Sequence, residues 1–417
     1  MGPTLEMRRG DKVRMNVRSE LVEIATLHWH GFHLPAAADG GPHQPVAPGE
    51  TWSPAFEVRQ RASLFWYHSH AHQRAGPQVY AGLAGAIYVR DDESERLDLP
   101  NEYGVDDIPL VVQDRAFSSD GSFVYSASMH SRMMGARGDT LLVNGTVDSV
   151  FEAASDRLRL RVLNGSNARF YSFSFSDARS FHLIASDGGL LERPLHSKSV
   201  LLAPGERAQI VVDLSDGRAA ELRARSAGNM GMGGGMMGRG MMGRERLDGG
   251  MGGGSDFGVL DILPGISRRR GASLPRQLVS LPAADASVAV RQRRFVLDMG
   301  MGMMGGFTIN GKSMDMQRID ERVPMNEWEI WQIENASMMA HPFHIHDVQF
   351  RILDRDGKPP PAGEQGLKDT VVVNSRESVR LLLRFEDYAD PDLPYMYHCH
   401  ILEHEDAGMM GQFVVTR

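Results

Sequence analysis

Short apolar runs separated by turn residues recur along the whole chain. Examples are Ala86–Val89, Leu158–Leu163 and Gln209–Leu214, which are rich in Val, Ile and Leu. Gly, Pro and Asp residues separate these runs, and long segments with a 3.6-residue apolar period are few. Such spacing is typical of β-sandwiches. The sequence therefore predicts an all-β fold built from many short strands.

Two connector-like stretches divide the chain into three parts. Residues 91–107 are rich in charged and turn residues, and residues 264–290 are rich in Arg and Pro. A length of 417 residues also indicates two or three domains rather than a single core. We therefore expect domains at residues 1–95, 96–265 and 285–417.

A recurring phrase indicates that one sandwich has been duplicated within the chain. Pro48-Gly49-Glu50 and Pro204-Gly205-Glu206 each precede an alternating apolar run, and Asn374–Ser378 stands in the same place before Val379–Leu383. Self-similarity of this kind is a signature of repeated structural units. Residues 228–254 are nearly all Gly, Met and Arg, a composition that cannot bury enough surface to fold alone. We expect them to form a loop in the second domain.

Composition and charge exclude several classes of protein. Hydrophobic residues make up 42% and charged residues 24% of the chain, as in ordinary globular proteins. The 45 Lys and Arg against 53 Asp and Glu give a net charge of -8, which lacks the basic footprint of a nucleic-acid-binding protein. The chain also lacks a long apolar stretch and a signal-peptide-like start. We therefore expect a soluble, mature or trimmed chain with neither nucleic acid nor membrane as a partner.

The histidines carry the strongest chemical signal. Ten of the 16 fall in four short clusters: His28-Trp29-His30, His68-Ser69-His70, His341-Pro342-Phe343-His344-Ile345-His346, and His398-Cys399-His400 with His404. Each cluster contains a His-x-His pair, and alternation along a strand points both imidazoles of a pair to the same side. Eight imidazoles can therefore converge on one space. Such convergence is expected around a metal, for which imidazole suits Cu, Zn, Fe and Ni.

Cys399 is the single cysteine, so the chain has no internal disulfide and no Cys-pair metal site. It lies between His398 and His400, and alternation sends its thiolate to the opposite face of the strand. With His341, His404 and Met409, that face offers two imidazoles, a thiolate and a weak thioether, the ligand set of a blue-copper centre. Zinc would require a stronger fourth ligand and would leave the eight-histidine arrangement unexplained. The pattern favours copper.

The four motifs resemble the copper signatures of multicopper oxidases, the family of laccases, ascorbate oxidase and bacterial cuprous oxidases. The strings Met396–Met410 and His341–His346 are most similar to the bacterial copper-efflux oxidases, and the resemblance spans the whole chain. It implies three cupredoxin-like Greek-key β-sandwich domains. It also implies type 1 copper in the third domain and a trinuclear cluster between the first and the third. The first histidine motif begins only at residue 28, so we expect the opening strands of the first domain to be shortened or absent.

The resemblance assigns the ligands of four copper ions by motif order. It gives type 1 copper to His341, Cys399, His404 and Met409. It gives type 2 copper to His28 and His344, one type 3 copper to His30, His68 and His400, and the other to His70, His346 and His398. Two carboxylates, Asp39 and Glu405, resemble the family's proton-relay residues; the alternative is that they are exposed loop residues without a role. His33, His43 and His72 are expected to lie near the copper motifs without ligand roles.

Methionine is abundant, with 25 residues, and much of the excess lies in two Gly-rich stretches. Thioethers are soft ligands that select Cu(I), and copper-efflux oxidases carry a Met-rich insert that takes up Cu(I). The resemblance therefore makes candidates of Met339 and of the Met/Gly-rich loop 228–254, although the loop can also be a plain linker. The loop candidates are Met230, Met232, Met236, Met237, Met241, Met242 and Met251, and a second cluster is Met299, Met301, Met303 and Met304. The acid that similar cuprous oxidases carry before the third motif is replaced here by Ser337.

The leading functional hypothesis is an oxidase that couples one-electron oxidation of Cu(I) or phenols to reduction of O2, in copper tolerance. The alternatives are a laccase acting mainly on phenols and aromatic amines, a non-catalytic copper-sequestering protein, and a nitrite reductase or simple blue-copper carrier. Neither a nitrite reductase nor a simple blue-copper carrier has a use for all four His-x-His motifs. By resemblance the protein is periplasmic or secreted, and a monomer is favoured.

Overall fold

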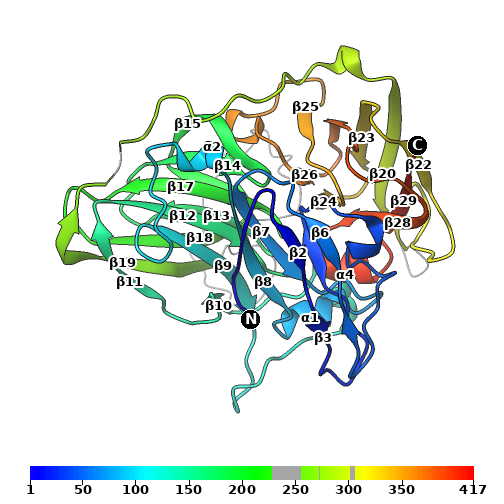
Figure 1. Ribbon diagram of the computed structural model, residues 1–417. Helices are drawn as coiled ribbons and strands as arrows, with labels where there is room; N and C mark the ends of the chain where they lie inside the picture. The colour runs from blue at the N-terminus through cyan, green and yellow to red at the C-terminus, as the bar shows by residue number, and fades with distance from the viewer. Residues whose placement is uncertain (228–254, 272, 301–305) are drawn as a thin grey trace, which may run out of the picture.

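A computed structural model describes residues 1–227, 255–271, 273–300 and 306–417 (Figure 1). These residues form an all-β structure with four short α-helices and three 3-10 helices, labelled η. The predicted fold class is therefore confirmed. Three successive stretches of the chain build their own sheets, and no sheet mixes strands from two stretches within the described residues. Figure 1 places the sheets of the middle stretch beside those of the C-terminal stretch, with the N-terminal strands packed along both.

The first stretch builds a four-stranded sheet in the order β1-β8-β7-β4 and two small two-stranded sheets, β2-β6 and β3-β5. Its elements are β1 (Leu5–Arg8), β2 (Lys12–Arg14), β3 (Val17–Arg18), β4 (His28–His30), η1 (Ala36–Ala38), β5 (Thr51–Trp52), β6 (Ala55–Glu57), β7 (Ser63–His68), α1 (Ala75–Tyr80), β8 (Ala84–Arg90) and α2 (Asp92–Glu95). Three strands precede the first histidine motif. The expected opening strands are thus short but present, because β1 pairs in parallel with β8.

The middle stretch packs a six-stranded sheet, β10-β9-β12-β17-β14-β15, against a five-stranded sheet, β11-β19-β18-β13-β16. Its elements are β9 (Asp107–Arg115), α3 (Met129–Met134), β10 (Thr140–Val143), β11 (Val150–Ser155), β12 (Arg157–Asn164), β13 (Phe170–Phe175), β14 (Phe181–Ser186), β15 (Gly189–Ser197), β16 (Ser199–Leu202), β17 (Arg207–Asp213), β18 (Ala220–Ala227) and β19 (Asp256–Arg269). The expected boundary at residue 265 falls inside β19, which continues to pair with β11 beyond it.

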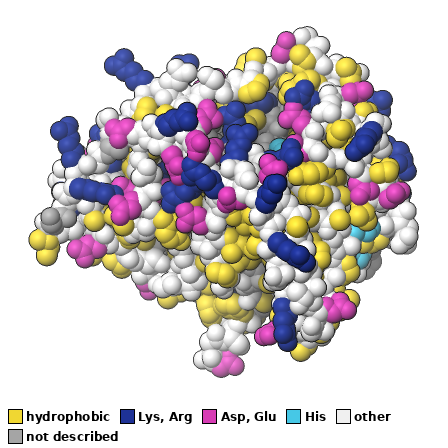
Figure 2. Space-filling model, in the orientation of Figure 1, with side chains coloured by type: hydrophobic (Ala, Val, Ile, Leu, Met, Phe, Trp, Pro, Cys, Tyr) yellow, Lys and Arg dark blue, Asp and Glu magenta, His cyan; other side chains and the backbone are white. Residues whose placement is uncertain are grey.

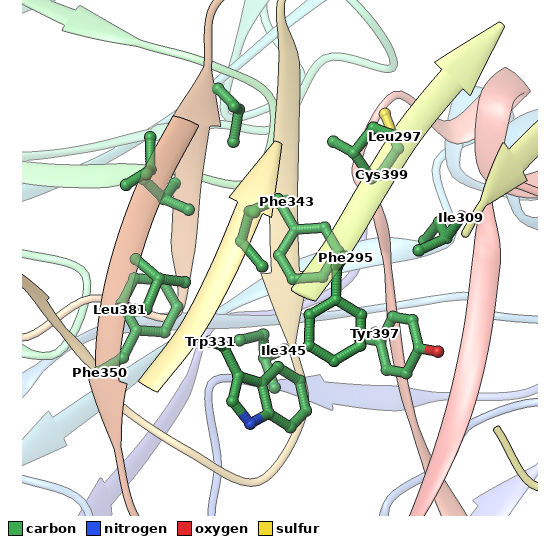
Figure 3. Close-up of a cluster of buried hydrophobic side chains, with 14 of the residues drawn as sticks. Phe295, Leu297, Ile309, Trp331, Phe343, Ile345, Phe350, Leu381, Tyr397 and Cys399 are labelled. Carbon is green, nitrogen blue, oxygen red and sulfur yellow. The ribbon is translucent and has the colours of Figure 1, made fainter. Parts of the chain in front are cut away.

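The third stretch forms two five-stranded sheets, β21-β20-β23-β27-β25 and β22-β29-β28-β24-β26. Its elements are η2 (Ala286–Val288), β20 (Arg291–Met299), β21 (Phe307–Ile309), β22 (Glu321–Pro324), β23 (Glu329–Asn335), β24 (His341–Ile345), β25 (Arg351–Arg355), η3 (Ala362–Glu364), β26 (Thr370–Val373), β27 (Ser378–Leu383), β28 (Asp390–Cys399), α4 (Leu402–Asp406) and β29 (Met410–Thr416). Phe295, Trp331, Phe343 and Tyr397 form the centre of the core between the sheets (Figure 3). Cys399 belongs to the same core and lies at its edge beside Leu297.

Candidate copper centres

Eight imidazoles from the first and third stretches meet in one buried space. Strand pairing within each stretch brings the first histidines together. His28 is opposite His68 in β4 and β7, and His344 is opposite His398 in β24 and β28. The two strand pairs then face each other. The His28 ring stacks on that of His346 at 3.8 Å between centroids, and the His30 ring stacks on that of His344 at 3.7 Å.

The eight rings form three groups, two of which share His30, and within each group the ligand atoms lie within 4.8 Å of one another. The groups are His30, His68 and His400; His70, His346 and His398; and His28, His30 and His344. The first two have the same members as the expected type 3 sets, and the third contains both expected type 2 ligands. The structure thus brings together every histidine that motif order assigns to the cluster.

The ring nitrogens are arranged as a metal site requires. His28 Nδ1 lies 3.0 Å from the carbonyl oxygen of Asp39, and His344 Nδ1 lies 2.8 Å from that of Asp369. These bonds put the proton on Nδ1, so each Nε2 is left with a free lone pair, buried and without any hydrogen-bond partner. An orphaned buried nitrogen is costly unless something binds it. The donor set therefore fits copper, and the outer bonds fix the ring orientation.

Burial favours the neutral form of the His344 and His30 imidazoles. Burial, followed by the neighbouring imidazole of His346, lowers the pKa of His344 well below its usual value. Burial and the imidazole of His344 act in the same direction on the pKa of His30. A metal ligand must be unprotonated, so both shifts favour metal binding at neutral pH.

A second group lies on the opposite side of β28. His341 Nδ1 is 3.4 Å and His404 Nδ1 is 3.6 Å from the sulfur of Cys399, and the two nitrogens are 3.3 Å apart. Met409 is buried beside them, and its carbonyl oxygen accepts a hydrogen bond from the backbone of Cys399. Burial raises the pKa of Cys399, so its thiol needs a bound cation to become a thiolate.

The outer nitrogens of this second group have partners that the sequence did not reveal. His404 Nε2 donates to the carbonyl oxygen of Met133 at 3.0 Å, so helix α3 of the middle stretch covers this ring. His341 Nε2 lies 2.8 Å from the hydroxyl of Ser337, the position where an acid was expected. A backbone carbonyl from a distant helix leaves no pattern in the sequence around His404.

The two expected relay carboxylates are buried, not exposed. Asp39 Oδ2 lies 2.8 Å from His346 Nδ1. Glu405 lies within 3.2 Å of His70 Nδ1 and within 3.1 Å of His398 Nδ1. The alternative of exposed loop carboxylates is therefore wrong, and each carboxylate contacts the outer nitrogen of a cluster histidine. The proton-relay role stays a prediction.

Other expected residues lie outside these groups. His33 pairs with Asp387 and His43 with Gln412, and neither belongs to a metal-ligand group in the described residues. Met339 is 3% exposed and packs in the core, so its burial argues against the expected role as an accessible Cu(I) ligand; its neighbour Met338 is 63% exposed. The loop candidates from Met230 to Met251, together with Met301, Met303 and Met304, lie outside the described residues.

The fold and the two donor groups define an all-β copper oxidoreductase. The chain belongs to the multicopper oxidase family: family profiles described as multicopper oxidase match residues 1–94 and 289–417. It is 36% identical, over all of its length and 82% of the relative's, to the multicopper oxidase mco of Staphylococcus aureus. It is 35% identical, over its full length and 83% of the relative's, to the cell division protein FtsP of Yersinia pestis.

Among solved structures it is similar to CueO from Ochrobactrum sp., a laccase-like multicopper oxidase with oxidase activity towards lignin model compounds and lignosulfonate. That likeness has a TM-score of 0.88 at 36% identity and covers 100% of this chain and 90% of the other. The predicted family is therefore confirmed, and with it an oxidase that uses O2 as acceptor. Because relatives of nearly equal identity carry different names, the site residues decide between the functions that those names suggest.

Proposed function

We propose that the chain couples one-electron oxidation of Cu(I) or phenolic substrates at a type 1 copper to reduction of O2 at a trinuclear copper cluster. The observation that carries this proposal is the position of Cys399. Its sulfur belongs to one donor group, while its neighbours His398 and His400 belong to the other. Bound copper supplies the one-electron steps and the binding of O2 at these positions. Four electrons and four protons convert each O2 to two waters.

The residues of the chain divide this work. Cys399 and its backbone join the two donor groups. Electrons therefore travel from the Cys399 sulfur to His398 or His400, each one peptide bond away. Both donor groups are buried, with His341, His404 and the eight cluster histidines at 1% exposure or less. Burial keeps partly reduced oxygen away from substrate. Asp39 and Glu405, in contact with outer imidazole nitrogens, are the proposed holders of protons for the cluster.

The structure leaves both substrate classes open at the type 1 site. Ser337 supplies a hydroxyl where an acid was expected, which weakens a dedicated Cu(I) site and favours access for phenols. Two exposed thioethers lie close to the type 1 histidines: Met338 follows Ser337, which contacts His341, and Met133 itself contacts His404 through its carbonyl oxygen. Thioethers favour Cu(I). Steady-state rates with Cu(I) and with a phenol, each with and without added Cu(II), test the proposal. If neither Cu(I) nor a phenol supported oxygen uptake, the result would contradict the proposal and favour a copper-sequestering protein.

The cofactor proposal is four copper ions per chain. Ten histidines, Cys399 and Met409 in the assigned roles account for one type 1, one type 2 and two type 3 ions. We expect metal analysis after removal of loosely bound ions to approach four copper ions per chain. A stable content near one would instead support a simple blue-copper carrier.

The Met/Gly-rich loop 228–254 is proposed to collect Cu(I) for the type 1 site. Replacing its methionines by Leu keeps apolar bulk but removes the sulfur donors. We expect oxidation of Cu(I) at low copper to fall severalfold, with oxidation of a small phenol unchanged or improved. The test is the apparent affinity for Cu(I) and for the phenol, each measured on the same preparation of the loop variant and of the wild type. An unaltered affinity for Cu(I) would make the loop a linker and the enzyme laccase-like.

The proposed setting is the periplasm or the outside of the cell, with a role in copper tolerance. The described residues contain no helix long and apolar enough to span a membrane. Basic and acidic side chains are interspersed on the face shown in Figure 2, which fits small-molecule reductants better than a nucleic acid. We propose three domains, with the middle one extended to Arg269, and a monomeric chain.

A further inference from the structure

None of the described residues of the middle stretch belongs to the cluster groups, yet one of its turns touches the cluster histidines. This turn is Pro204–Arg207, which leads from β16 into β17 and ends on the first residue of β17. The backbone N–H of Gly205 donates to the carbonyl oxygen of Asn164, and Gly205 has a φ of +84°. A Cβ added at Gly205 would lie 3.0 Å from three atoms of the His400 ring, Cγ, Cδ2 and Nε2. The glycine therefore packs directly on the imidazole.

His400 depends on this packing more than its neighbours do. Both of its ring nitrogens are buried without a hydrogen-bond partner. Each of the other seven cluster histidines has at least one ring nitrogen within 3.5 Å of a polar partner, for example His68 with the Ser69 carbonyl oxygen at 2.9 Å. Because no hydrogen bond orients the His400 ring, the surfaces against it must do so.

Arg207, at the end of the same turn, acts on His30 through Asp369. Its guanidinium holds the Asp369 carboxylate with two bonds of 2.6 Å, and Asp369 Oδ1 lies 3.1 Å from His30 Nε2. This contact places the His30 proton on Nε2 and turns Nδ1 towards His68 Nε2, 3.4 Å away. A bidentate charge-assisted pair is strong and directional, so it fixes both the tautomer and the angle of the ring.

Arg207 also joins all three stretches of the chain. Its remaining side-chain hydrogen bonds go to the carbonyl oxygens of Leu64 in β7, Gly205 and Asp187. The side chain is 1% exposed. A guanidinium can satisfy so many fixed acceptors at once because its donors form a rigid plane, which a Lys ammonium cannot reproduce.

We propose that the Pro204–Arg207 turn is a positioning element of the cluster, with Gly205 setting the His400 ring and Arg207, through Asp369, setting the His30 ring. The inference rests on the proposed function, since it treats both histidines as copper ligands. It gives the middle domain, whose described residues include no cluster ligand, a direct part in shaping the cluster.

The chain contains a matched control in the other copy of the same phrase. In Pro48-Gly49-Glu50 the glycine has a φ of +79°, and an added Cβ would meet nothing within 4 Å. The two turns also share a backbone bond, Glu50 N–H to Ala47 C=O and Glu206 N–H to Ala203 C=O, both at 3.0 Å. Gly49→Ala and Gly205→Ala therefore impose the same backbone strain, and only the second meets an imidazole.

Arg161 provides the corresponding control for Arg207. It forms a bidentate pair with Asp107, with two bonds of 2.7 Å, and is 3% exposed, but it contacts none of the cluster histidines. The comparison is then Gly205→Ala with Gly49→Ala, and Arg207→Lys with Arg161→Lys. All four are made in the full-length, copper-loaded protein.

The readouts are the copper retained against a chelator, the electron paramagnetic resonance spectrum of the cluster copper, the blue absorption and the thermal midpoint. We expect Gly205→Ala and Arg207→Lys to weaken retention of cluster copper about 10-fold or more. His30 and His400 are assigned to the same type 3 copper, so both variants should also uncouple the type 3 pair and add its resonance to the spectrum, while the blue absorption stays. Gly49→Ala and Arg161→Lys should lower the thermal midpoint alone.

Two results would overturn the inference: a Gly205→Ala variant that holds copper like Gly49→Ala, or an Arg207→Lys variant that holds copper like Arg161→Lys with an unchanged cluster spectrum. If one of the two cluster variants fails to fold, the other decides. A wild-type protein that holds a single copper and shows no type 2 signal would instead contradict the proposed function itself.

Discussion

Cys399→Ser should remove the blue colour and the oxidase activity together. The sulfur of Cys399 lies within 3.6 Å of both type 1 imidazole nitrogens, and the residue is the covalent link to His398 and His400. A serine hydroxyl is similar in size but is a much harder and less acidic donor, so neither the charge-transfer band nor the electron path survives. Substitution of an outer partner costs 10- to 100-fold, and we expect turnover of Cu(I) and of a phenol to fall by more than about 100-fold.

Absorption spectra and oxygen uptake measure this, with copper analysis as the control. Because Cys399 contributes no donor to the cluster side, the variant should keep the other three copper ions and their type 2 resonance signature. Normal turnover in a colourless protein would show that electrons reach the cluster by another route.

Asp39→Asn and Glu405→Gln should slow re-oxidation of the reduced enzyme by O2 while leaving reduction of the blue centre nearly intact. Both carboxylates contact outer nitrogens of cluster histidines, Asp39 at His346 and Glu405 at His70 and His398. Protons are consumed only where O2 is reduced, so the defect belongs to that half-reaction. We expect a loss of about 10- to 100-fold, the range seen when partners of metal ligands are removed.

Rapid-mixing measurements of each half-reaction separate the two steps. Copper content must be compared in the same samples, because an amide also holds an imidazole less firmly than a carboxylate does. Slower re-oxidation at full copper content supports proton delivery. Equal slowing of both half-reactions would place these carboxylates in folding or ligand geometry instead.

The sequence motifs did not predict the surroundings of the Ser337 and Met339 side chains. The sequence indicated that the acid before the third motif was missing, but only the structure places the Ser337 hydroxyl on His341 Nε2. Met339 looked like an available soft ligand, and the structure buries it in the core. Whether a side chain at such a position faces solvent depends on the packing of β23 and β24, which local spacing does not encode.

The sequence alone determined the strand-rich fold class and the sides of the strands that carry the donors. Alternation along a strand is a local property, so His398 and His400 had to share one face and Cys399 the other. Sequence similarity added the sorting of the histidines into three copper sites. These features depend on residues close together in the chain or on motifs that can be compared directly.

Only the tertiary structure decided which distant groups complete the site. The Met133 carbonyl oxygen on His404, the Asp369 carboxylate on His30 and the Gly205 surface on His400 all come from parts of the chain far from the histidines that they contact. A backbone carbonyl or a glycine surface carries no residue signature of its own. Such contacts arise from how the three β-structures pack together. That packing depends on many individually weak van der Waals contacts between residues far apart in the sequence, which no local pattern specifies.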